Sequence, residues 1–138
     1  MQPDADNNFR NTFKKHDRLK SSLSIETLYR ENHYIVLYPL KCYYAFSERN
    51  ENESAMRVSF TVPKKTFKNA VARNKLKRRM REAYRLNFRK IWETEMQQNN
   101  KQLKLFFIYI GKDIFDYNSI EKNMVVLMNK LKITYNAC

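Results

Sequence analysis

The sequence has few of the residues that interrupt or cross-link a chain: one glycine, three prolines and two cysteines among 138 residues. Cys42 and Cys138 belong to no Cys-x-x-Cys pair and to no larger spaced set, which argues against a disulfide framework and a zinc site. No apolar run approaches the ~18 residues of a membrane span, and the N-terminus MQPDADNNFRN lacks the apolar core of a signal peptide. We therefore expect a cytoplasmic protein with two reduced thiols and no membrane partner.

Acidic residues are also scarce. The chain contains 27 Lys and Arg residues against 14 Asp and Glu residues, which gives a formal net charge of +13. Much of this excess is local, because the stretch from Lys64 to Lys90 holds twelve Lys or Arg residues and one acid, Glu82. Such a concentrated positive field attracts polyanions, with nucleic acid as the first candidate and an anionic membrane surface as the second. A helix face that merely contacts solvent is the remaining interpretation.

The length of the chain fits one domain that buries a single core. Residues 1–16 are polar and show no periodicity, and we predict a flexible N-terminal arm there. Hydrophobic residues make up 43% of the chain and include nine Tyr, nine Phe and one Trp. This composition predicts one folded domain over residues 17–138.

The spacing of apolar residues predicts elements in the order αββαβα. A first helix at about 24–32 precedes the strand HYIVLYPLKCYYAF, and Pro39 should bend this strand or mark its edge. MRVSFTV should pair with that strand as a hairpin, and LKLFFIYI should form a third, buried strand. A long helix at about 69–97 and a last helix at about 117–131 complete an α+β fold class, a single-domain α/β sandwich. The core side of the last helix is predicted from the stripe of Ile120, Met124, Leu127, Met128 and Leu131.

The long basic helix has two distinct sides when its residues are placed at 100° intervals. The outward row of cations would repel itself by a few tenths of a kcal/mol per like-charge pair unless a partner neutralised it. Because the planar guanidinium group matches phosphate oxygens with two hydrogen bonds, the row predicts contact with a phosphodiester backbone. The predicted core stripe is Ala72, Leu76, Met80, Ala83, Asn87 and Ile91, and the predicted outward row is Asn74, Arg78, Arg81, Arg85 and Arg89.

Further cations lie around the N-terminus of this helix. Arg73 stands where free backbone N–H groups also favour an anion. Lys64 and Lys65 end the preceding strand, and Lys68 lies in the loop between that strand and the helix, so all three are expected to extend the anion-binding site. Such a site tolerates hydrated Mg²⁺ held mainly by the nucleic acid, since no carboxylate cluster offers ligands. We expect no metal ligand in the protein itself.

Aromatic residues suggest a second contact. Tyr34, Val36 and Tyr38 alternate along the first strand, and exposed aromatics on a sheet stack unpaired bases. Tyr29 would close the other side of this surface. Ile35 and Leu37 occupy the opposite face, and the sequence leaves open which of the two faces is buried.

Catalytic chemistry is not indicated by the sequence. His16 and His33 have no serine, cysteine or carboxylate set whose spacing suggests a nucleophile and its base. We therefore expect a binding protein without catalytic residues of its own.

The stretch RNKLKRRMREAYR, residues 73–85, closely resembles the Arg-Asn-Arg motif helix of the bacterial ribonuclease P protein components. As in that family, it follows a strand that ends in a lysine pair, VSFTVPKK at residues 58–65, and then NAV at 69–71. Upstream, FKKHDRL at residues 13–19 resembles the opening segment of the family. The similarity covers about residues 13–131.

The resemblance implies a small α+β sandwich with a left-handed crossover through the motif helix. The protein would be a monomer in a 1:1 ribonucleoprotein, where it binds the catalytic RNA and the 5′ leader of precursor tRNA while the RNA performs the Mg²⁺-dependent hydrolysis. Lys75 replaces the second arginine of the motif, and Ile25 stands where the family often has phenylalanine. The motif helix would face the RNA through Arg73, Asn74, Lys75, Lys77, Arg78 and Arg81, and the leader cleft would contain Ile25, Tyr29, Val36 and Tyr38 with Lys65 nearby.

Three other functions are compatible with the same basic composition. A basic leucine-zipper helix needs sustained apolar heptads after the basic part, and the chain instead continues as MQQNNKQ. A membrane-surface helix needs bulkier apolar anchors than Ala72 and Leu76. A general single-strand RNA-binding protein without a role in tRNA processing fits the charge and the aromatics equally well, and the ordered motif is what argues against it.

Overall fold

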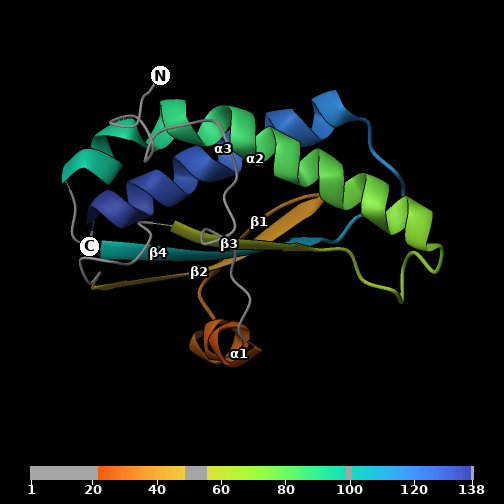
Figure 1. The fold of residues 1–138 in the computed structure, drawn as a ribbon, viewed down its shortest axis with the longest axis horizontal. Helices are drawn as coiled ribbons and strands as arrows, with labels where there is room; N and C mark the ends of the chain where they lie inside the picture. The colour runs from red at the N-terminus through yellow and green to blue at the C-terminus, as the bar shows by residue number, and fades with distance from the viewer. Residues whose placement is uncertain (1–21, 49–55, 99–100, 138) are drawn as a thin grey trace, which may run out of the picture.

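The computed structural model describes residues 22–48, 56–98 and 101–137 (Figure 1). The predicted arm at residues 1–16 and Cys138 lie outside these ranges. The elements in chain order are α1 Ser22–Glu31, β1 Tyr34–Leu37, β2 Leu40–Glu48, β3 Met56–Thr61, α2 Ala70–Gln98, β4 Lys101–Tyr109 and α3 Tyr117–Ala137.

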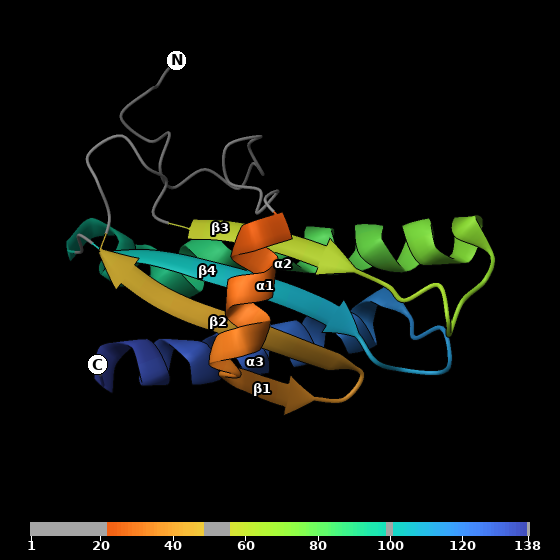
Figure 2. The same ribbon diagram turned by 90° about the horizontal axis from the view of Figure 1, so that it is seen from below.

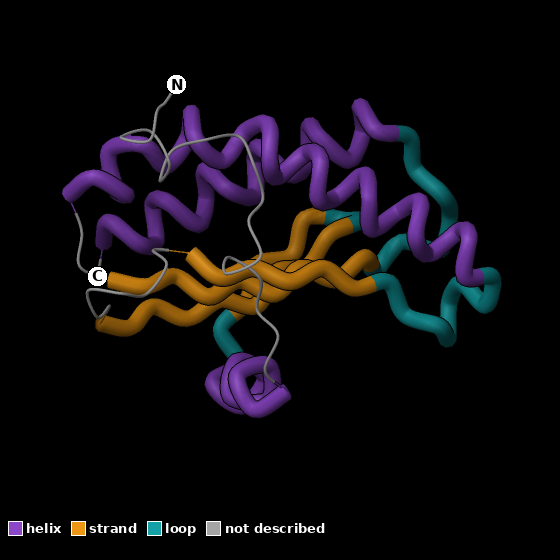
Figure 3. Tube along the Cα trace, viewed as in Figure 1, coloured by secondary structure: helices purple, strands orange, loops and turns teal. Residues whose placement is uncertain are grey.

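The four strands form one sheet in the order β1-β2-β4-β3. β1 and β4 are both antiparallel to β2, whereas β3 is parallel to β4. α2 and α3 cover one face of the sheet, and α1 lies across the other (Figures 1 and 3). We call the face under α2 and α3 the inner face and the face that α1 crosses the outer face. These layers confirm the predicted α+β fold class.

Two details of the predicted strand order are wrong. The segment expected as one bent strand is two strands, because the chain reverses at Tyr38 and Pro39, joined by a cis peptide bond. The predicted hairpin between this segment and β3 does not form, because β4 lies between β2 and β3. β4 has a buried apolar inner side and also carries Phe106 and Ile108 on its outer face, which suits a central strand. The corresponding outer-face positions of β3 are the polar residues Arg57, Ser59 and Thr61. The observed order is therefore αβββαβα.

The connection from β3 through α2 to β4 is left-handed, as the resemblance implied. In Figure 2 both strands point the same way, and α2 lies behind the sheet on the side opposite α1. Connections between parallel strands of one sheet are nearly always right-handed. This exception therefore distinguishes the fold from an ordinary β-α-β unit.

The core lies between the inner face and the two long helices. The predicted central stripe of α2 is buried there, with Leu76, Met80 and Ala83 fully inaccessible to solvent. All five predicted core residues of α3 are buried, and Tyr135 extends the stripe because the helix runs to Ala137, beyond the predicted end. The predicted two-sided organisation of α2 is thus confirmed for its buried side.

The single glycine stands at a close approach between two connections. A Cβ atom added to Gly111 would lie 2.8 Å from the Cβ atom of Pro39. The adjacent backbones are joined, because the Ile110 N–H group donates a hydrogen bond of 2.7 Å to the Pro39 carbonyl. The turn between β1 and β2 can therefore pack against the end of β4 only where a side chain is missing.

Replacing Leu76 by Ala should destabilise the protein by about 2–5 kcal/mol, because it removes a buried side chain and leaves a cavity between α2 and the sheet. Val71→Ala is the matched control on the same helix, since Val71 is 75% exposed, and it should change the free energy of unfolding by less than about 0.5 kcal/mol. Urea denaturation of both variants measures the difference. Equal losses would contradict the assigned burial of this face.

Candidate nucleic-acid interface

The N-terminus of α2 is fixed by a side-chain cap. The Asn69 side-chain oxygen accepts a hydrogen bond of 2.8 Å from the Val71 N–H group, and the Asn69 carbonyl accepts one from the Arg73 N–H group. Asparagine is among the best capping residues because its side chain satisfies an N–H group that the helix leaves unpaired. The sequence segment Asn-Ala-Val-Ala-Arg therefore defines where the basic helix begins.

Arg73 holds the loop that precedes α2. Its Nη1 atom donates hydrogen bonds to the carbonyl oxygens of Phe67, at 2.7 Å, and Lys68, at 2.9 Å. The Phe67 ring packs edge-on against Tyr109, with 5.8 Å between ring centroids. The loop is thus attached both to the helix and to the end of β4. It carries the predicted lysines Lys64, Lys65 and Lys68, and all three are exposed.

The predicted outward side of α2 does face away from the core. Arg78 is exposed and makes no hydrogen bond or ion pair with any other residue in the described ranges. Because the core lies on the opposite side, these cations lie on the side of the helix that faces away from the sheet, and the preceding loop adds three exposed lysines. Asn74, Lys75 and Arg78 are exposed, and Arg73, Lys77, Arg81, Arg85 and Arg89 are half-buried.

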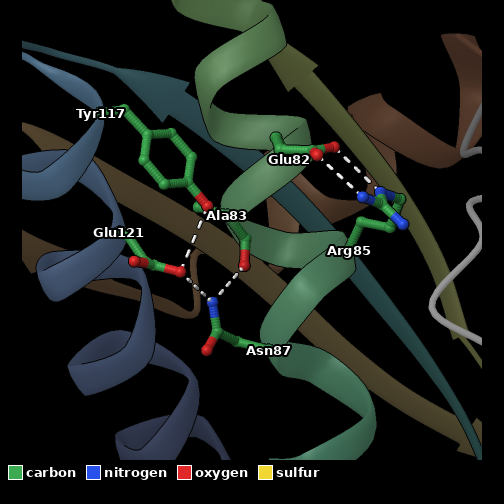
Figure 4. Close-up of polar contacts among 6 residues, drawn as sticks. All are labelled: Glu82, Ala83, Arg85, Asn87, Tyr117 and Glu121. Atoms are coloured by element: carbon green, nitrogen blue, oxygen red, sulfur yellow. Dashed lines mark hydrogen bonds and ion pairs between the residues drawn. The ribbon is translucent and has the colours of Figure 1, made fainter.

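One cation of the row is paired within the helix. The guanidinium group of Arg85 donates two hydrogen bonds to the Glu82 carboxylate, of 2.9 and 2.7 Å (Figure 4). The hydrogen bonds from Arg85 lower the pKa of Glu82 below its usual value. Arg85 therefore presents a partly neutralised charge, whereas Arg78, about two turns earlier, has no hydrogen bond or ion pair in the described ranges.

The rotation of α2 about its axis is fixed by a polar contact with α3. The buried Asn87 side-chain amide donates to the Ala83 carbonyl at 2.8 Å and to a Glu121 carboxylate oxygen at 3.0 Å. The Tyr117 hydroxyl donates to the same Glu121 oxygen at 3.2 Å (Figure 4). Burial, with the charge of Glu121, raises the pKa of Tyr117 to about 12. These bonds direct the arginine row of α2 away from α3.

A second candidate surface, which is rich in aromatic residues, lies on the outer face of the sheet. α1 packs there through Leu28, which contacts Tyr43 and Phe106, with Ile25 half-buried beside them. Tyr29 stays 45% exposed, although its ring lies edge-on to Tyr43 at 4.7 Å between centroids. The structure therefore decides which face of the first strand is open. Ile35 and Leu37 pack on the core, and Tyr34 and Val36 lie on the outer face, exposed by 45% and 47%.

Lys41 is a member of this surface that sequence reasoning missed. It pairs with Val36 across β1 and β2, and its Nζ atom lies 4.3 Å from the ring centroid of Tyr34 and 4.8 Å from that of Tyr43. The cation between two rings holds them in place by cation–π attraction. Lys41 and Tyr43 are two residues apart on β2 and therefore lie on the same face of the sheet. The sequence would have indicated this once the turn at Tyr38 and Pro39 was recognised.

Tyr38, predicted to belong with Val36 on the strand, lies instead in the turn after β1. Its ring packs edge-on against Phe115 at 5.7 Å between centroids, and its hydroxyl oxygen accepts a hydrogen bond from the Lys112 N–H group. The structure thus brings Ile25, Tyr29 and Val36 to the outer face and directs the Tyr38 ring toward the loop that follows β4. The exposed Tyr34 is closer to the role predicted for Tyr38.

The described ranges contain neither a metal-binding cluster of side chains nor a membrane-spanning helix. Within residues 22–48, 56–98 and 101–137, no group of three or more His, Cys, Asp or Glu side chains could hold a metal ion. No helix in the described part of the chain is long and apolar enough to cross a membrane. Cys42 is fully buried, and this burial raises its pKa far above the usual value, so its thiol is not a nucleophile.

Comparisons with known proteins agree on one family. The sequence model of the Ribonuclease P family matches residues 13–132. The ribonuclease P protein component of Porphyromonas gingivalis is 35% identical over 111 residues, 80% of this chain and 79% of that protein. The component of Chlorobium phaeobacteroides is 28% identical over 132 residues, 90% of each chain. The solved RNase P protein of Staphylococcus aureus has the same fold, with a TM-score of 0.61 and 21% identity over 86% of this chain and 94% of that one.

Replacing Arg73 by Ala should lower both stability and nucleic-acid affinity, because Arg73 supplies a charge and also two hydrogen bonds to the preceding loop. We expect the free energy of unfolding to fall by about 1–3 kcal/mol. Arg78 carries the same charge but makes no hydrogen bond within the described ranges. Arg78→Ala should therefore weaken nucleic-acid binding and change the free energy of unfolding by less than about 0.5 kcal/mol. Urea denaturation and binding titrations compare the two. Identical stabilities would show that the loop does not depend on Arg73.

Proposed function

Because this chain belongs to the family of ribonuclease P protein components, we propose that it binds the catalytic RNA of ribonuclease P through α2 and the 5′ leader of precursor tRNA on the outer face of the sheet. Membership of the family establishes its role as a ribonuclease P subunit, a component of an endoribonuclease. The observation that carries the proposal for α2 is its two-sided structure, with one side buried and a row of cations on the other.

The catalytic RNA would contact α2 and the loop before it. Guanidinium groups at Arg78, Arg81 and Arg89 suit phosphate oxygens, and the exposed side chains of Asn74 and Lys75 add donors at the helix start. The loop lysines would bind neighbouring phosphates. Lys75 acts as a single cation at this surface, since an ammonium group lacks the fork that gives arginine its bidentate contact.

The 5′ leader would lie beside α1, across β1 and β2. Tyr29, Tyr34 and Val36 offer exposed rings and an apolar surface for unpaired bases. Lys41 supports the exposed ring of Tyr34 and the buried ring of Tyr43 from the same face, and it supplies positive charge for the backbone. Ile25 of α1, half-buried against the outer face of the sheet, contributes apolar contact in place of stacking.

Hydrolysis is assigned to the RNA in this proposal. The described residues contain no donor cluster for a metal, so the Mg²⁺ that supports the reaction would be held mainly by RNA phosphates. The protein contributes positive charge near those phosphates and a surface for the leader. One protein monomer would act with one RNA, in the cytoplasm where precursor tRNA is processed.

The first test is cleavage of a precursor tRNA by a bacterial ribonuclease P RNA at low Mg²⁺, with and without the protein. The wild type should restore cleavage, because its cations lower the repulsion between the two RNAs. Asn74→Ala/Arg78→Ala should restore it less, since both side chains are exposed on the proposed RNA-binding side. Lys122→Ala/Lys130→Ala, which alters two exposed cations of α3, is the matched control and should behave as wild type.

The alternative of a general single-strand RNA-binding protein gives a different result. It predicts salt-dependent RNA binding without any restoration of cleavage. If α2 contacts six to ten phosphates, RNA affinity should fall by about 10³–10⁵ between 50 and 200 mM salt. A nearly flat salt dependence would argue against phosphate contact altogether.

The leader surface is tested by Tyr34→Ala. The variant should weaken binding of precursor tRNA to the reconstituted enzyme by about 1–3 kcal/mol, the contribution of one stacked base. Affinity for mature tRNA, which has no leader, should stay unchanged. Ile133→Ala removes an exposed apolar side chain from α3 and serves as the control. A loss of the same size for both tRNAs would place Tyr34 outside the leader contact.

A further inference from the structure

The outer face of the sheet continues on the far side of α1, beyond the proposed leader surface. α1 packs on the middle of the sheet, where Leu28 contacts Tyr43 of β2 and Phe106 of β4. Figure 2 shows the helix running across the strands, which extend on both sides of it. The outer face is therefore divided into two strips, and the proposed leader surface uses one of them.

The register of the sheet assigns residues to each strip. Lys41 pairs with Ile108 in the strip of the leader surface, and Ala45 pairs with Lys104 in the other. Lys104 also pairs with Arg57 of β3. The two rows are separated along β4 by about 13 Å, four residues at the rise of a strand. Because a helix with its side chains is about as wide, α1 fills the space between the rows and leaves both accessible.

Arg57 and Lys104 are an unusual pair, because like charges on directly opposite strand positions destabilise a sheet. Both side chains are half-buried, and neither makes a hydrogen bond or ion pair with the rest of the described chain. In the described ranges, the outer-face positions of all four strands contain no Asp or Glu. Folding alone does not explain the pair, whereas a polyanion would neutralise it.

We propose that Arg57 and Lys104 form a second site for single-stranded RNA, which binds phosphate groups of a leader that has passed α1. The proposal rests on the proposed function, because the leader is delivered to the first strip. The route crosses α1, which exposes Tyr29 and Arg30. α1 also exposes Glu26 and Glu31, so phosphate contacts belong to the two strips and the helix between them offers a ring for a base.

The experiment compares two precursor tRNAs bound to the reconstituted ribonucleoprotein. A leader of about 4 nucleotides occupies the first strip only, and one of about 16 nucleotides reaches the second, within the range of single-strand site sizes. Arg57→Gln/Lys104→Gln removes both charges from strand positions where folding does not need them. Lys122→Gln/Lys130→Gln, on exposed positions of α3, removes the same charge elsewhere.

With the long leader, the Arg57→Gln/Lys104→Gln enzyme should bind about tenfold more weakly at 0.15 M salt. The slope of log affinity against log salt should decrease by about 1.4, since each phosphate contact on a single strand contributes ~0.7. With the short leader it should bind as wild type, and the α3 control should match wild type with both leaders. Equal effects on the two leaders, or no effect on either, would overturn the second site. If the wild-type protein fails to support cleavage of either precursor, the proposed function itself fails.

Discussion

α2 buries one side and exposes the other, so its rotation about its own axis determines which of its cations point away from the core. Apolar contacts of Leu76, Met80 and Ala83 fix that rotation against the sheet. The Asn87 amide adds a directional restraint, because its hydrogen bonds to the Ala83 carbonyl and to Glu121 require one orientation of the two helices. A polar residue in a buried stripe loses contact with water, and its bonds offset that loss. The arginine row points outward as a consequence.

The outer face follows a different rule. Among the described elements, α1 alone covers it, and this short helix packs on the central row through Leu28. The strands beside it keep the Tyr34 ring exposed. The Lys41 ammonium group lies over the rings of both Tyr34 and Tyr43 and holds them together. A face buried by two long helices could not keep such side chains accessible. The difference between one short and two long helices therefore divides the sheet into a side that forms the core and a side that keeps side chains accessible, on which we propose that the leader binds.

The sequence was sufficient for α2, because a 3.6-residue apolar period over a long segment determines both its extent and its buried side. It was insufficient for strand order. β3 and β4 are parallel neighbours joined through α2, and local patterns do not show which strand becomes central. The break at Pro39 could be read as a bend or as a turn, since proline is compatible with both. Arg73 was assigned from sequence to phosphate contact alone, and only coordinates show its bonds to the Phe67 and Lys68 carbonyls.

The two surfaces lie on opposite sides of the sheet, and the loop between β3 and α2 joins them. β3 ends at Thr61, which stands in the same cross-strand row as Ile108 and, through it, Lys41. The chain then carries its exposed lysines to the start of α2, the helix of the inner side. A polyanion bound to either surface would therefore meet the same loop at one end. The shape of this loop sets the separation of the two surfaces, which gives the hydrogen bonds of Arg73 a role beyond that of one more positive charge.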